Sequence, residues 1–201
     1  MEVLNYIIAY FSSTLGMIEL AGSIFTLLCV YFAAKHNIWT WFWGVLGVLC
    51  FGYIFWEVTL YFDAVLQLAF YLPIQFVGLW VWMNKDSIQT ELVETFPTWY
   101  WIPILIGIAV LTWFSAGILV SVGGAFPVLD SIIVWSSVTA QIMLAWKYWQ
   151  NWLLWVGIDV LAVYVYFMKG LFITSGLYAI LLVIAAMGLW SWYNKSKLST
   201  T

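Results

Sequence analysis

Stretches of about 20 apolar residues recur along this chain, and they constrain its fold more than any other feature. An α-helix rises about 1.5 Å per residue, so each stretch is long enough to cross a hydrocarbon layer of roughly 30 Å. Of the 201 residues, 66% are hydrophobic and only 7% are charged. The sequence therefore predicts an all-α polytopic membrane protein. We place its seven transmembrane helices at Leu15–Ala34, Trp39–Val58, Ala64–Met83, Trp99–Ser121, Val128–Trp146, Trp152–Met168 and Leu171–Trp192.

The segments between and around these spans are short. Residues 1–14 cannot cross a membrane and are expected to form an interfacial segment. The N-terminus lacks the basic region of a secretory signal, so we expect no cleavage there. Residues 84–121 form a polar loop and a linker helix, and residues 193–201 form a tail.

The lysines predict the orientation of the chain in the membrane. When alternate loops are counted, Lys169 stands alone on one side and all the other lysines fall on the opposite side. By the positive-inside rule, the C-terminus lies in the cytoplasm and the N-terminus outside. The cytoplasmic lysines are Lys35, Lys85, Lys147, Lys195 and Lys197.

The chain resembles itself at an ungapped offset of 110 residues. The segments GLWVWMNK (Gly78–Lys85) and GLWSWYNK (Gly188–Lys195) agree at six of eight positions, and Trp39 matches Trp149. This agreement favours duplication of a three-helix unit, residues 15–83 and 128–192. Three spans reverse the chain, so a fourth must return it before the second unit can lie parallel to the first. The predicted fold is therefore 3+1+3, two parallel repeats in a SWEET-like arrangement, with a ligand site between them near the membrane midplane.

The stretch NWLLWVGID carries a carboxylate inside an apolar span. Trp152, Trp155 and Asp159 are spaced i, i+3 and i+7, so they share one face of a helix. A charge about 10 Å into the span costs at least a few kcal/mol unless it faces protein or water. We expect this face to line a ligand site, whereas the alternative is a structural hydrogen bond to a neighbouring helix. At the offset of 110, the equivalent residues of the first repeat are Phe42, Val45 and Leu49.

Two further spans carry amide and hydroxyl side chains at helical spacing. Lipid solvates such groups poorly, so we expect these faces to turn inward together with Asp159. Ligand contact and hydrogen bonding between helices are both open for them, and Trp43 either lines a cavity or packs. These residues are Gln67, Tyr71 and Gln75 in the third span, and Asp130, Ser137 and Gln141 in the fifth.

The residue types that phosphate binding, metal binding and catalysis require are absent from the sequence or lie outside the spans. The sequence has no arginine and its lysines lie at span ends, so a phosphorylated anion has no guanidinium partner within the membrane. The one histidine, His36, lies in a loop, so neither a metal site nor a histidine-activated nucleophile is expected. The net charge of −3 gives no reason to expect a nucleic acid partner. We therefore expect no enzyme and no cofactor. Aromatic faces beside an acid suit a flat molecule that is cationic or carries hydroxyl groups.

Three stretches together resemble the PnuC-type bacterial vitamin transporters. They are the N-W-x-x-W-x-x-x-D element of Asn151–Asp159, NIWTWFWGVLG (Asn37–Gly47), and YFDAVLQLAFYLPIQFVGLWVW (Tyr61–Trp82). The resemblance covers about residues 17–195. It implies a 3+1+3 fold, a homotrimer in the bacterial cytoplasmic membrane, and facilitated diffusion of an unphosphorylated vitamin precursor that cytosolic phosphorylation traps.

The resemblance and the chemistry of the residues favour nicotinamide riboside, a flat pyridinium cation with ribose hydroxyls. Thiamine and riboflavin are alternatives within the same family, and a membrane scaffold that transports nothing is the alternative from another class. The chain contains no P-loop and no obvious proton relay, so we expect downhill transport. The candidate substrate-binding residues are Asn151, Trp152, Trp155, Asp159, Gln67, Tyr71, Gln75, Ser137, Gln141 and Trp43.

Overall fold

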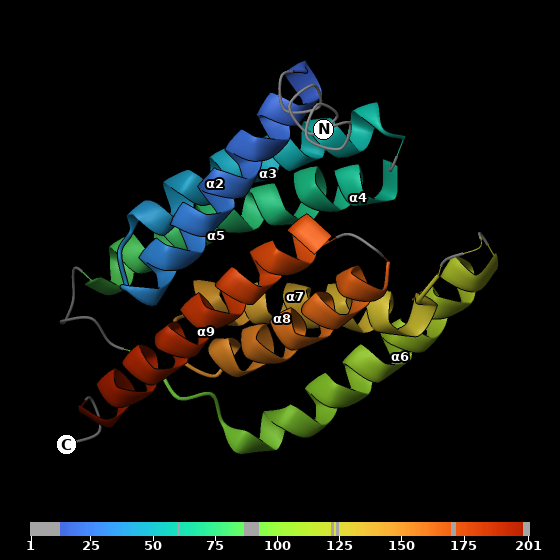
Figure 1. Ribbon diagram of the computed structural model, residues 1–201. Coiled ribbons are helices and arrows are strands. Elements are labelled where there is room, and N and C mark those ends of the chain that lie inside the picture. The colour runs from blue at the N-terminus through green and yellow to red at the C-terminus, as the bar shows by residue number, and fades with distance from the viewer. Residues whose placement is uncertain are drawn as a thin grey trace. The chain divides into compact units, whose positions relative to one another are not determined.

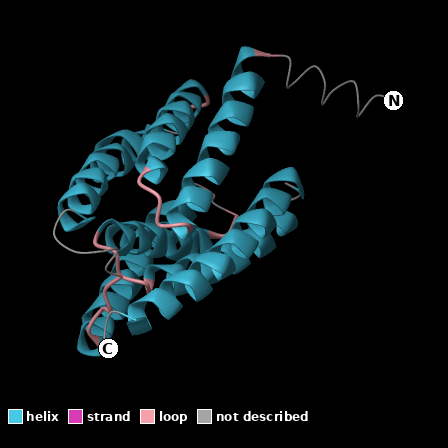
Figure 2. Ribbon diagram, turned by 90° about the vertical axis from the view of Figure 1, so that its left-hand side faces the viewer, coloured by secondary structure: helices cyan, strands magenta, loops and turns pink. Residues whose placement is uncertain are grey.

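The computed structural model describes residues 13–59, 61–86, 93–121, 123, 125–169 and 172–198. Residues 1–12, which belong to the predicted interfacial segment, lie outside this part. The described chain is helical, with short connecting loops (Figure 2). Its helices are α2 (Thr14–Ala34), α3 (Trp39–Glu57), α4 (Tyr61–Leu66), the π-helix η1 (Gln67–Tyr71), α5 (Leu72–Asp86), the 3₁₀-helix η2 (Thr98–Tyr100), α6 (Trp101–Ser121), α7 (Pro127–Ala145), α8 (Asn151–Met168) and α9 (Phe172–Leu198).

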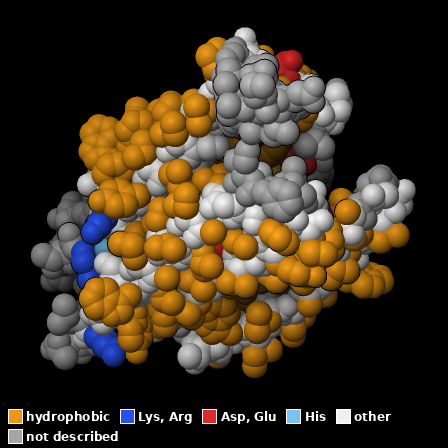
Figure 3. All heavy atoms as spheres, viewed as in Figure 1, with side chains coloured by type: hydrophobic (Ala, Val, Ile, Leu, Met, Phe, Trp, Pro, Cys, Tyr) orange, Lys and Arg blue, Asp and Glu red, His pale blue; other side chains and the backbone are white. Residues whose placement is uncertain are grey.

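Within the described residues, seven helical stretches are long and apolar enough to cross a membrane, as the sequence predicts. The helix α4, the π-helix and α5 together make the third of these stretches. Large apolar side chains are widely exposed on the helices, and orange side chains dominate the face drawn in Figure 3. Trp113 of α6 is 79% exposed. Such surfaces suit a hydrocarbon solvent, in which an exposed Trp or Ile meets lipid tails rather than water.

The chain divides into two compact units, Met1–Asn84 and Lys85–Thr201. In the first unit, α2 packs against α3, and α3 packs against α4 and the π-helix. In the second unit, α6 packs against α7, α7 against α8, and α8 against α9. Figure 1 draws the first unit from blue to green and the second from green to red.

Each unit packs a tryptophan of its second helix over a glycine of its third. Trp41 of α3 lies over Gly78, where a Cβ would overlap the indole. Trp152 of α8 lies over Gly188, where a Cβ would be 2.7 Å from three indole atoms. Both indoles are 1% exposed. Each also meets a second tryptophan edge-on: Trp41 with Trp82, centroids 5.3 Å apart, and Trp152 with Trp192, 5.8 Å apart. The repeated G-L-W-x-W motif therefore encodes one contact, a glycine that admits an indole and a tryptophan that borders it.

The turns between the first and second helices show that the predicted offset of 110 is wrong in this region. In the first unit, His36 has a φ of 56° and donates its N–H to the carbonyl of Ala33. In the second, Lys147 has a φ of 63° and donates to the carbonyl of Leu144. These residues correspond at an offset of 111, as do Trp41 and Trp152, and the C-caps Val58 and Lys169. Single identities between tryptophans recur by chance in a chain with 16 of them, whereas hydrogen-bonded turns fix the register.

The register changes by one residue within the third helix. The small buried residues Ala64 and Ser175 are 111 residues apart. The glycines that a tryptophan ring packs against, Gly78 and Gly188, are 110 residues apart. The first unit therefore has one more residue between these points. The π-helix Gln67–Tyr71 lies in this interval, while α9 of the second unit continues as an α-helix. A π-turn is the form in which an α-helix accommodates one added residue, because its i→i+5 hydrogen bonds close a larger loop.

An extended segment before α6 is hydrogen-bonded to the turn that begins α8. The Glu94 N–H donates to the carbonyl of Lys147 at 2.9 Å, and the Trp149 N–H donates to the carbonyl of Glu94 at 3.2 Å. The side chain of Gln150 accepts from the Phe96 N–H at 3.0 Å and donates to the Phe96 carbonyl at 3.1 Å. These four bonds fix the start of α8, where the candidate site residues begin.

Tyr148 belongs to the same turn and packs against this extended segment before α6. Its ring meets Phe96 edge-on, with centroids 5.0 Å apart. Burial above all, and then the Glu94 carboxylate and the Tyr100 hydroxyl, raises the pKa of Tyr148 above its ordinary value. The hydroxyl therefore stays neutral at physiological pH.

Substitution of Gly188 by alanine tests the contact between tryptophan and glycine. The new Cβ would lie 2.7 Å from the Trp152 indole, so the ring or the helix must move, and we expect a loss of about 1–3 kcal/mol in stability. Gly176→Ala is the matched control in the same helix, because a Cβ there meets nothing within 4 Å. The control should be neutral or stabilising by up to about 1 kcal/mol through helix propensity. Thermal unfolding in detergent measures both. Equal stability of the two variants would contradict the contact.

Candidate functional site

The start of α8 buries the polar residues that the N-W-x-x-W-x-x-x-D element carries. Asn151 is fully buried and Asp159 is 4% exposed, whereas Trp155 is half-buried. The Asn151 amide donates to the carbonyl of Tyr148 at 2.6 Å. Its Oδ1 has no hydrogen-bond partner among the described residues, and neither has the Trp152 Nε1. A buried polar atom without a partner costs about 1–3 kcal/mol, so a hydrogen bond from a polar ligand to either atom would offset that cost.

Trp152 and Trp155 occupy different surroundings although they share a helix face. The Trp152 indole is enclosed between α8 and Gly188 of α9, where its ring holds the two helices together. Trp155 retains exposed ring surface one turn further along. Of the two, Trp155 is therefore the one whose ring can stack on a ligand, and Trp152 is the one that fixes the helix.

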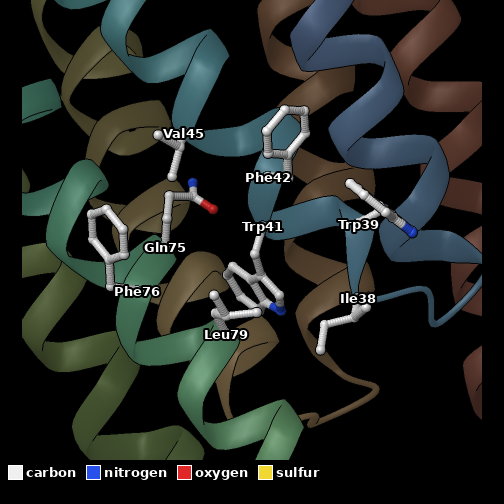
Figure 4. Close-up of a pocket in the computed structure, with 8 residues that line it drawn as sticks. All are labelled: Ile38, Trp39, Trp41, Phe42, Val45, Gln75, Phe76 and Leu79. Carbon is white, nitrogen blue, oxygen red and sulfur yellow. The ribbon is translucent and has the colours of Figure 1, made fainter.

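In the first unit, Gln75 lies at a pocket between α3 and α5. Its side chain is 4% exposed and packs against Gly44, where a Cβ would overlap the amide. The Gln75 Oε1 has no hydrogen-bond partner among the described residues. Figure 4 shows the amide among the rings of this pocket, which has a volume of about 340 Å³. The pocket is lined by Ile38, Trp39, Trp41, Phe42, Val45, Gln75, Phe76 and Leu79.

Gln67 lies on the same side of the third helix as Gln75, and Trp43 does not join them. The Cβ of Gln67 is 3.6 Å from the place where a Cβ on Gly52 would stand, so both glutamines face glycines of α3. Tyr71 is half-buried at the other end of the π-helix. Trp43 instead stacks on Phe25 of α2, with centroids 5.6 Å apart and an interplanar angle of 29°. It thus lies on the side of α3 that faces α2.

The fifth span contributes one amide and one ion pair. Gln141 is 7% exposed and Ser137 is half-buried, both on α7. Asp130, which the helical spacing places with them, instead accepts from Lys169 Nζ at 2.9 and 3.0 Å. Lys169, which the sequence predicts to stand alone on its side of the membrane, is therefore paired. Sequence spacing missed this pair because its partners are 39 residues apart.

The corrected register shows how the two units differ at their candidate residues. Where the first unit has a glycine facing a glutamine amide, the second has a tryptophan on α8 and a 1% exposed alanine on α9. Gly44 is not among the predicted site residues, because a glycine has no side chain that could bind a ligand. The sequence marks it only by its position three residues after Trp41. The corresponding pairs are Gly44 with Trp155, Val48 with Asp159, and Gln75 with Ala185.

Within the described part of the chain, no group of three His, Cys, Asp or Glu side chains could hold a metal ion. The polar atoms at hand are amides, hydroxyls, indole N–H groups and one buried carboxylate. Such a set offers an organic molecule hydrogen bonds, stacking surfaces and one negative charge.

Comparison with known proteins identifies the family. A model of the family described as "Nicotinamide mononucleotide transporter" matches residues 16–194. The "Nicotinamide riboside transporter PnuC" of Escherichia coli (strain K12) is 31% identical over 91% of this chain and 87% of that protein. The protein of the same name from Haemophilus influenzae is 24% identical over 98% of this chain and 86% of that protein.

A solved structure described as "Crystal structure of the Vitamin B3 transporter PnuC" has the same fold, with a TM-score of 0.72. It is 23% identical and is matched over 96% of this chain and 88% of that one. The predicted PnuC-type resemblance is confirmed, and the chain belongs to the nicotinamide mononucleotide transporter family as a bacterial multi-pass membrane transporter.

Proposed function

We propose that this chain carries nicotinamide riboside across the bacterial cytoplasmic membrane. The observation that carries the proposal is the 31% identity, over 91% of the chain, to a protein named for that substrate. The buried carboxylate of Asp159 and the exposed face of Trp155 suit a flat pyridinium cation.

The riboside is a better substrate than the mononucleotide named by the family model. The two differ by one phosphate, which needs cationic donors wherever it leaves water. This chain has no arginine, and its lysines lie at the ends of spans. Asp159 would also repel a phosphate. A single negative charge in the interior therefore favours the cationic, unphosphorylated molecule.

Each candidate residue except Trp43 has a role in this proposal. Asp159 offsets the pyridinium charge and Trp155 stacks on the ring, while Trp152 holds α8 in place. The Oδ1 of Asn151 and the Oε1 of Gln75, which have no partner within the described chain, accept hydrogen bonds from ribose hydroxyls. The remaining contacts come from the polar side chains of Gln67, Tyr71, Ser137 and Gln141. Trp43 has no part in them, because its ring stacks on Phe25 of α2.

The proposed architecture is 3+1+3, with two parallel three-helix repeats joined by α6. Support comes from the turns at His36 and Lys147 and from the indole contacts at Gly78 and Gly188, which recur in both units. The distribution of lysines supports a cytoplasmic C-terminus through the positive-inside rule. A reporter active only in the cytoplasm, fused after residue 201, tests this, and an inactive fusion would reverse the orientation.

The family resemblance implies a homotrimer, which light scattering in detergent distinguishes from a monomer.

Transport into proteoliposomes tests the function. Labelled nicotinamide riboside should equilibrate across the bilayer without a pH or sodium gradient, because transport is downhill. Nicotinamide mononucleotide should compete weakly, since its phosphate has no partner. Uptake of thiamine but not of the riboside would replace the substrate and keep the transporter. Exchange of neither molecule would favour a scaffold, and gradient-driven accumulation would contradict downhill transport.

Asp159→Asn deletes the charge and keeps the size and hydrogen-bonding capacity of the side chain. If the acid offsets a cationic ring, binding of the riboside should weaken by about 1–3 kcal/mol, the range of a charge-assisted hydrogen bond. Calorimetry on purified protein measures the change. Assembly should be unaffected, because the amide still fits the buried position. Wild-type affinity in this variant would remove Asp159 from the site.

Trp155→Leu removes the stacking surface and keeps the position apolar. We expect riboside affinity to fall by about 0.5–2 kcal/mol. Trp190→Leu is the matched control, because Trp190 is 73% exposed on α9 and should leave affinity unchanged. If both variants bind as wild type does, Trp155 is only a packing residue.

A further inference from the structure

Resting on the proposed function, we propose that the extra residue in the third helix of the first unit is a substrate-positioning insertion. It produces the π-helix Gln67–Tyr71 and thereby sets the directions of the Gln67 and Tyr71 side chains. The second unit builds the equivalent helix without it. The insertion therefore distinguishes the half that presents glutamines from the half that presents Trp155 and Asp159.

The π-turn changes how Gln67 and Tyr71 are related. The Leu72 N–H donates to the Gln67 carbonyl, an i→i+5 bond. An α-helix has 3.6 residues per turn, so residue i+4 lies about 40° past residue i in the direction of the helix's rotation. A turn closed at i+5 reverses that sense, so Tyr71 is rotated by some tens of degrees relative to Gln67. A straight helix with the same residues would not give this arrangement.

Pro73 explains why the wide turn lies at this point. Proline has no N–H, so the carbonyl of Ala69 cannot receive its usual α-helical bond from residue 73. The equivalent residue of the second unit is Val183, which keeps its N–H. The proline and the added residue therefore act together, since a helix that already lacks one bond accommodates an insertion more readily.

Gly52 of α3 provides the space that the wide turn needs. A Cβ at Gly52 would lie 3.1 Å from Leu68 Cδ2 and 3.6 Å from the Cβ of Gln67. The equivalent residue of the second unit is Val163, whose carbonyl accepts a hydrogen bond from Ser175 at 2.9 Å. The second unit therefore has a valine where its second helix is bonded to a straight helix, and the first unit has a glycine against the π-turn.

Packing alone does not require the insertion. The positions on both sides of it recur in the second unit without a π-turn: Ala64 and Ser175 are both buried, and Gly78 and Gly188 each admit an indole. A wide turn inside a membrane also disturbs backbone hydrogen bonds that lipid cannot replace. An irregular turn that the fold can dispense with, and that begins and ends on polar side chains, is therefore explained by what those side chains contact.

The experiment converts this segment to the pattern of the second unit. The straightened variant combines deletion of Ala69 with Pro73→Val, and it should fold because α9 has this form. The matched control is Pro73→Val alone, which keeps the added residue. Gly52→Val is made in the wild type and in the straightened variant. Riboside uptake in proteoliposomes gives KM and kcat, and thermal unfolding in detergent gives Tm.

We expect the straightened variant to keep its Tm within a few degrees of wild type and to raise KM by about 3- to 10-fold, the effect of one misplaced neutral hydrogen bond. The Pro73→Val control should keep the wild-type KM. Gly52→Val should lower Tm in the wild type but not in the straightened variant, while KM stays raised there. This separates positioning from stability.

Two outcomes would overturn the inference. A wild-type KM in the straightened variant would remove the positioning role. Failure of that variant to fold, or equal destabilisation by Gly52→Val in both backgrounds, would show that the extra residue is not an insertion absorbed by the π-turn. The wild-type protein is assayed in parallel, so absence of riboside uptake there counts against the proposed function. In that case the same comparison of KM is made with the substrate that the wild type carries.

Discussion

A hydrocarbon solvent offers no hydrogen bonds to the peptide backbone, and the rest of this structure depends on that constraint. Each spanning segment must satisfy its own N–H and C=O groups, which leaves the helix as the available form. Departures from the α-helix are therefore costly and have local causes. The π-helix Gln67–Tyr71 is such a departure, and it lies beside a proline and opposite Gly52. It begins at Gln67 and ends at Tyr71, two of the candidate site residues, and this links the backbone irregularity to the candidate site.

The two units share a frame and differ in how they fill it. The frame is the close approach of the second and third helices, which Gly78 and Gly188 permit by admitting an indole. In lipid, helices associate through such close packing, because lipid tails are as apolar as the side chains and no hydrophobic effect drives the helices together. One turn away the units diverge, with an amide over Gly44 in one and Trp155 in the other. An asymmetric ligand requires unlike halves, so a shared frame with exchanged side chains suits a binding protein.

The two aspartates of the second unit illustrate how surroundings separate structural from functional charge. Asp130 is paired with Lys169 at 2.9 Å near the ends of α7 and α8, where the pair is partly exposed. Asp159 is 4% exposed within a span. A charge at that depth is stabilised only by protein, water or a cationic ligand. The first carboxylate is therefore explained by the fold, whereas the second is the basis of our proposal for substrate recognition.

The sequence by itself determined the helical class, the seven spans and the family, because hydropathy over about 20 residues and the motifs around Asn151–Asp159 are local signals. It also identified G-L-W-x-W as a repeated element, although not that its glycine seats an indole. Only the tertiary structure decided the register of the second helices, the π-turn and the pocket at Gln75. A one-residue insertion has no signature in composition, and identities between tryptophans at a fixed offset conceal it. Hydrogen bonds across the turns at His36 and Lys147 reveal it because they depend on the path of the backbone rather than on residue type.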